Sequence, residues 1–157
     1  MSNSSAIPRD DFGIYLVFCN KNVDPDTITV ILEIEPTEAV KLGEVSRYSW
    51  NNQEYISKTG LWELEFPSED QNSTPESELS SVIATLQGKE KALAKLRDAG
   101  YKPYLSCCAG NTLDFYFDDA AMQFLGQNGI GLSVYFSQEY TAEGFNFEDR
   151  YPYQSTE

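Results

Sequence analysis

Four oxygen-bearing side chains near the start of the chain have the spacing of a calcium-binding loop. Asn22, Asp24, Asp26 and Glu33 occupy relative positions 1, 3, 5 and 12, where such loops place oxygen ligands. The sixth position of a calcium loop needs glycine for a sharp turn, and here it is Thr27. The sequence therefore argues against calcium, and we expect no metal and no cofactor.

The same carboxylates are explained by the start of a short helix. Asp24 can cap a helix, and Pro25 is preorganised for its first position. Ile28 and Leu32 then share one helix face, and Pro36 prevents the helix from continuing. A structural role for these residues is the simpler interpretation.

Catalytic chemistry has little support in the sequence. The chain contains no histidine, so a Ser-His-Asp set is excluded and a cysteine nucleophile would lack its usual base. Three acidic pairs are the candidates for metal-assisted catalysis, but helix caps or solvated surface explain each of them. We therefore expect that the protein is not an enzyme. The three pairs are Asp10-Asp11, Asp24/Asp26 and Asp118-Asp119.

Charge is the most informative bulk property. Twenty-five acids face eleven bases, which gives a net charge of −14. Such a surface repels free nucleic acid and anionic membranes, whereas it attracts and steers a cationic protein. The bases are concentrated, because residues 89–102 contain five bases and two acids. The sequence leaves open whether this basic helix pairs with its own acidic surface or with a second copy of the chain.

Length and composition predict one globular domain. The chain has 157 residues, of which 41% are hydrophobic and 13% aromatic. It shows no signal-peptide pattern and no apolar stretch long enough to cross a bilayer. Three cysteines are a poor disulfide framework, and Cys107 and Cys108 would point to opposite faces of a strand. We expect a cytoplasmic protein with reduced, buried thiols.

Hydrophobic periodicity predicts mixed strands and helices in a single α+β domain. Helices packed on one face of a mainly antiparallel sheet are the economical arrangement for this order. We expect a flexible N-terminus at 1–11, the domain at 12–137, and a partly docked, acidic and aromatic tail at 138–157. The expected strands are 12–19, segments of 43–66, 101–108, 112–117 and 130–137, and the expected helices start at Asp24-Pro25, Thr74-Pro75, Lys89 and Asp118-Asp119.

The polar loop near residue 70 and the tail are the predicted contact surface. Tyrosine and tryptophan are favoured interface anchors, and carboxylates supply steering and orientation. Both kinds of residue occur in the tail, which is too aromatic for an ordinary disordered segment. The candidate binding residues are Glu69, Asp70, Tyr140, Phe145, Phe147, Glu148, Asp149, Tyr151 and Tyr153.

One motif resembles a known family. The spacing Asp24-Pro25-x-x-Ile28-Thr29-x-x-Leu32-x-Ile34-x-Pro36-Thr37, followed by Gly43 and Gly60-Leu61-Trp62, resembles a bacterial family known only as domain of unknown function 4279. The resemblance covers roughly residues 12–137 and implies no activity. It implies that the motif is structural, and we expect Trp62 to pack beneath the helix.

One position departs from the family pattern. Members usually have glycine directly after the leucine, whereas this chain has Glu33. If this residue ends the helix in the left-handed conformation, glutamate costs about 1 kcal/mol relative to glycine.

These observations favour a small acidic binding protein that occludes a cationic protein, as an immunity protein neutralises a toxin or nuclease. The first alternative is a small-ligand or peptide-binding module, which a deep apolar cavity on an empty sheet face would favour. The second is a nucleic-acid mimic that inhibits a defence protein, with carboxylates in place of phosphates.

Overall fold

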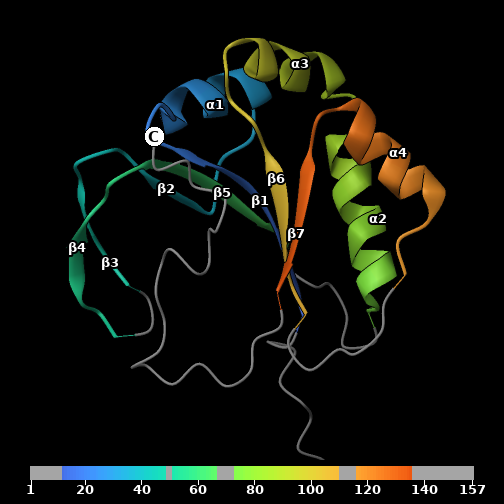
Figure 1. Cartoon of the computed structure of the whole chain (residues 1–157), viewed down its shortest axis with the longest axis horizontal. Helices are drawn as coiled ribbons and strands as arrows, with labels where there is room; N and C mark the ends of the chain where they lie inside the picture. The colour runs from blue at the N-terminus through green and yellow to red at the C-terminus, as the bar shows by residue number, and fades with distance from the viewer. Residues whose placement is uncertain (1–11, 49–50, 67–72, 110–115, 136–157) are drawn as a thin grey trace, which may run out of the picture.

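The computed structural model describes residues 12–48, 51–66, 73–109 and 116–135. The described chain forms a five-stranded sheet with helices on one face and a separate two-stranded hairpin (Figure 1). This confirms the predicted α+β class with a mainly antiparallel sheet. The strands are β1 (Gly13–Asn20), β2 (Glu38–Val40), β3 (Val45–Arg47), β4 (Glu54–Ile56), β5 (Gly60–Phe66), β6 (Tyr104–Cys108) and β7 (Gly131–Tyr135). The helices are α1 (Pro25–Leu32), α2 (Pro75–Leu86), α3 (Glu90–Asp98) and α4 (Asp119–Gln127).

The first strand of the chain lies at the centre of the sheet. The strand order is β2-β5-β1-β6-β7, and β1 pairs antiparallel with both β5 and β6. The last pair, β6 and β7, is parallel and is connected through α4, as parallel strands require a crossover. The sheet edges in the described chain are therefore the short β2 and the parallel β7.

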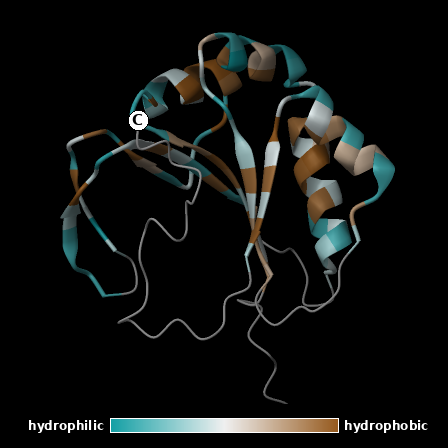
Figure 2. Cartoon of the chain, viewed as in Figure 1, coloured by the Kyte–Doolittle hydropathy of each residue, from teal (hydrophilic) through white to brown (hydrophobic). Residues whose placement is uncertain are grey.

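The main core lies between the sheet and its helices. Alternate residues of β1, namely Ile14, Leu16 and Phe18, are completely buried on this face. Phe18 packs edge-on against Trp62 of β5, with 5.7 Å between ring centroids. The helices close the core with apolar stripes, and Figure 2 shows the hydrophobic side of α2 turned toward the sheet. The stripe of α2 consists of Leu79, Val82 and Leu86.

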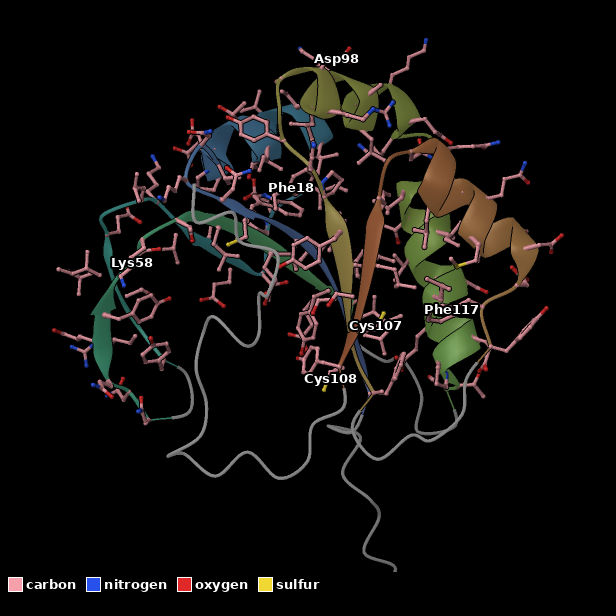
Figure 3. The ribbon with its side chains drawn as sticks, in the orientation of Figure 1. Phe18, Lys58, Asp98, Cys107, Cys108 and Phe117 are labelled. Atoms are coloured by element: carbon pink, nitrogen blue, oxygen red, sulfur yellow. The ribbon has the colours of Figure 1, made fainter. Side chains whose placement is uncertain are left out.

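The opposite, helix-free face carries a second and smaller apolar cluster. Val17, Cys19, Val40 and Leu61 are buried there. Several polar side chains of the strands are buried on this face as well. The adjacent residues Cys107 and Cys108 of β6 belong to different faces of the sheet, since they point to opposite sides of the strand (Figure 3). The buried polar residues that alternate onto the helix-free face are Glu63, Ser106 and Ser133.

Helix α1 begins and ends as its motif predicts. The side chain of Asp24 accepts hydrogen bonds from the backbone N–H of Asp26 at 3.3 Å and from the hydroxyl of Thr27 at 2.9 Å. At the other end, Glu33 has φ 57° and ψ 37°, and its N–H donates to the carbonyl of Thr29. The left-handed end that usually favours glycine is therefore occupied by glutamate.

Two expectations for the middle of the chain need correction. Strand β2 was not expected, because three residues are too few to show an alternating pattern. The strand expected at 112–117 is absent at Tyr116 and Phe117, which have no strand structure, and the rest of that segment lies outside the described residues. Phe117 still packs against the main core.

Candidate functional site

The contact residues expected from the sequence lie outside the described part of the chain. The same holds for the flexible N-terminus, the acidic pair at 10–11 and the tail at 138–157. These residues are Glu69, Asp70, Tyr140, Phe145, Phe147, Glu148, Asp149, Tyr151 and Tyr153. The structure therefore leaves them as predictions.

The two acidic pairs within the described residues lie at helix starts. Asp24 caps α1, and Asp118 caps α4 by accepting from the N–H of Ala121 at 2.8 Å. Asp26 pairs with Lys41 at 2.5 Å. Within the described ranges, no three His, Cys, Asp or Glu side chains are placed to hold one metal ion.

A group of carboxylates gathers at the β2 edge of the sheet, and we name it the acidic edge: Glu35, Glu38 and Glu65. The hydroxyl of Thr37 accepts from the N–H of Glu65 at 2.9 Å, which ties the start of β2 to the end of β5. Glu35 and Glu65 are exposed and Glu38 is half-buried. No ion pair to any of the three occurs in the described chain.

The register of the edge strand places like charges opposite each other. Glu38 of β2 lies directly across from Glu63 of β5, and Glu63 is only 3% exposed. Directly opposed like charges destabilise a sheet. A cation that approached Glu38 would reduce the repulsion between these two residues.

An exposed apolar patch lies on the hairpin that follows β2, and we name it the hairpin patch: Leu42, Val45 and Ile56. Val45 and Ile56 are cross-strand partners, and the three side chains are 55%, 63% and 67% exposed. The hairpin projects from the β2 side of the sheet (Figure 1). An apolar patch bordered by charged residues has the composition of a protein interface.

The other face of the hairpin turns toward the acidic edge. Tyr48 and Tyr55 stack there with centroids 4.4 Å apart. Burial raises the pKa of the Tyr55 phenol, and the negative charge of Glu38 raises it further. The charge of Glu38 acts on Tyr55, so the tyrosine face of the hairpin is the one near the acidic edge, and the hairpin patch lies on the opposite face of the same hairpin.

The basic helix α3 is largely unpaired. Lys89, directly before it, lies 3.8 Å from a carboxylate oxygen of Glu33. Lys91, Lys95 and Arg97 have no ion pair in the described chain. The acidic residues within the described ranges therefore leave most of the charge of this helix without an ion pair.

The fold and the acidic edge define a small α+β domain with a charged sheet edge and, among its described residues, no metal cluster. Its family follows from comparison with known proteins: the chain belongs to the family described as Domain of unknown function (DUF4279), whose model matches residues 10–138. Comparison with curated proteins and with solved structures gave no match. None of the described helices is long and apolar enough to cross a membrane.

Proposed function

We propose that this protein is a non-catalytic binding protein that occludes a basic protein partner. The acidic edge and the hairpin patch together are its proposed contact surface. One observation carries the proposal: three carboxylates at the β2 edge have no ion pair in the described chain, and the hairpin that follows β2 carries three exposed apolar side chains. Such a role is that of an immunity-type antagonist of a toxin or nuclease.

The two parts of the surface have different physical tasks. The carboxylates, supported by the net charge of −14, accelerate encounter with a basic surface and orient it. The apolar side chains of the hairpin patch supply the area whose burial provides affinity. The edge strand β2 also offers backbone groups with which an extended segment of the partner can pair.

We also propose that the protein acts in the cytoplasm. All three cysteines are free thiols in the structure, although Cys108 is only partly covered. Free thiols are typical of a reducing compartment.

The proposal is tested by capturing the partner from the native host and measuring its affinity for two double variants. Glu38→Gln/Glu65→Gln removes two charges from the acidic edge. Glu90→Gln/Asp98→Asn removes two charges from α3, where neither side chain makes an ion pair in the described residues. We expect the first variant to weaken binding about tenfold or more at low salt, and the second to leave it nearly unchanged.

Salt dependence provides the second readout. Affinity should fall as ionic strength rises, because screening shortens the range of the attraction. A captured partner with an acidic surface, or an affinity that is equal at low and high salt, would contradict the proposal. Equal effects of the two double variants would mean that net charge, and not the acidic edge, governs binding.

A further inference from the structure

A cleft of about 540 Å³ opens at one end of the sheet, far in sheet order from the acidic edge. It lies where β1 ends and where β6 and β7 begin. Its volume is within the range of sites that hold small organic ligands. The lining residues are Cys19, Asn20, Lys102, Pro103, Tyr104, Gly129, Gly131 and Leu132.

Glycines give this cleft its shape. Gly129 has φ +65°, a conformation that side chains rarely adopt. A Cβ atom at this residue would lie 2.7 Å from Nη1 of Arg97, so the guanidinium rests directly on the glycine. The N–H of Gly131 donates to the carbonyl of Pro103 at 3.1 Å and joins the starts of β6 and β7. The cleft therefore has a fixed backbone wall with a cation beside it.

Two cations border the cleft without a counter-ion in the described chain. Lys102 is one of its lining residues, and the guanidinium of Arg97 packs on Gly129, which is another. Both are exposed, and neither takes part in an ion pair or a hydrogen bond within the described residues. In a chain with a net charge of −14, two cations that border one cleft and have no counter-ion among the described residues favour a negatively charged group.

The rest of the cleft is mainly apolar. Pro103, Tyr104 and Leu132 contribute hydrophobic surface. Burial raises the pKa of the Cys19 thiol to about 11, so this side chain is neutral at physiological pH and adds to the apolar wall. The amide oxygen of Asn20, another lining residue, accepts from the N–H of Asn22 at 2.7 Å.

The charges around the cleft indicate which of its sides would hold an anionic group. The carboxylate of Glu63 disfavours the thiolate of Cys19, so negative charge is opposed at the β5 side of the cleft. Lys102 and Arg97 stand at the other side, at the end of α3 and the start of β6. A bound molecule would therefore direct its anionic group toward the cations and its apolar body toward the strands.

From this arrangement we infer that the cleft binds an organic carboxylate with a hydrophobic body. The carboxylate lies between Lys102 and Arg97, whose planar guanidinium can donate two parallel hydrogen bonds. The body packs on Pro103, Tyr104 and Leu132. The carboxylate belongs either to a free small acid or to the C-terminus of a peptide, because both present the same chemistry.

The site is separate from the proposed interface. It lies at the β1–β6–β7 end of the sheet and selects anions, whereas the acidic edge lies at β2 and selects cations. Failure of one proposal therefore leaves the other intact.

The test uses the full chain labelled with ¹⁵N and titrated with 3-phenylpropanoate, with 3-phenylpropanamide as the matched uncharged control. We expect saturable shifts of the amide signals of Lys102, Gly129, Gly131 and Leu132 with the acid. The amide should bind at least about tenfold more weakly, since it lacks the charge that the two cations recognise. A hydrophobic tetrapeptide with a free C-terminus, compared with its amidated form, separates the two sources of the carboxylate.

A pair of charge-matched variants assigns the effect to the cleft. Arg97→Gln/Lys102→Gln should weaken binding of the acid about tenfold or more. Lys91→Gln/Lys95→Gln removes the same charge from α3 at residues that do not line the cleft, and it should have little effect. Unchanged thermal unfolding of both variants shows that they are folded.

Three results would overturn the inference. One is equal binding of acid and amide, and another is an equal effect of the two double variants. The third is absence of saturation by both the acid and the free-carboxylate peptide up to about 10 mM, where a specific millimolar site would be largely filled.

Discussion

The indole N–H of Trp62 donates a hydrogen bond to the hydroxyl oxygen of Thr29 at 3.0 Å. Trp62 is completely buried, so its polar atom needs this partner. The same hydroxyl donates to the carbonyl of Pro25 at 3.1 Å. Thr29 thus connects the first turn of α1 to the centre of the core.

Removal of the Thr29 hydroxyl should be costly only while the indole is present. Thr29→Val keeps the shape and leaves a buried donor without a partner, which should lower the free energy of unfolding by about 1–3 kcal/mol. In a Trp62→Phe background the same change should cost much less, because no indole donor remains. Denaturant unfolding of the four proteins measures the coupling, and equal costs in both backgrounds would contradict the assignment.

Glu33→Gly should stabilise the protein. Glu33 has φ 57°, a left-handed conformation that glycine adopts without the steric cost of a Cβ atom. We expect a gain of about 1 kcal/mol in the free energy of unfolding. Glu33→Ala is the control, since it also removes the contact with Lys89 but keeps the Cβ atom. A gain in both variants would assign the effect to charge.

Two glycine substitutions should have opposite effects on stability. A Cβ atom at Gly60 would lie 1.9 Å from the carbonyl oxygen of Val23, so Gly60→Ala must displace backbone and should cost about 3 kcal/mol or more. Gly126 lies inside α4 with open space around its Cα. Gly126→Ala should therefore stabilise the protein by about 0.5–1 kcal/mol through helix propensity. Thermal unfolding of the pair tests both signs.

Stability should fall in alkaline solution partly through Cys19. Burial raises the pKa of this thiol from 9.0 to about 11, so the unfolded chain loses its proton before the folded protein does. The contribution of Cys19 to the free energy of unfolding is therefore fully present below pH 9 and is lost as pH rises toward 11. The loss is on the order of 2 kcal/mol.

Cys19→Ala isolates this contribution from other groups that titrate at high pH. The thiol of Cys107, raised to about 12 by burial, contributes with the same sign in both proteins. The variant should lose less free energy of unfolding than the wild type between pH 8 and pH 11. An identical loss in the two proteins would show that Cys19 does not titrate differently on folding.

Most of the elements were predictable because their signals are local. The cap and proline at Asp24-Pro25 predicted the start of α1, and the same signal at Thr74-Pro75 predicted the start of α2. Gly88 and Gly100, which follow α2 and α3, both have positive φ. Hydrophobic periodicity and helix capping depend on residues that are close in the chain, so a single sequence is enough to recognise them.

The features that were missed depend on contacts between distant parts of the chain. Strand β2 has three residues and is held by its pairing with β5, and the parallel pairing of β6 with β7 has no local signature. The cleft was missed for the same reason, because its lining comes from three strand ends. The excess of bases at 89–102 was visible in the sequence, but its position beside Gly129 was not.

The central position of β1 has a consequence for synthesis on the ribosome. Its neighbours β5 and β6 follow it by 40 and more residues, so the segment FGIYLVFC leaves the exit tunnel before either partner has emerged. An unpaired, strongly apolar strand favours association with chaperones or with other nascent chains. Native pairing must then close long loops in a late step, which makes slow, post-translational folding the natural outcome of this topology.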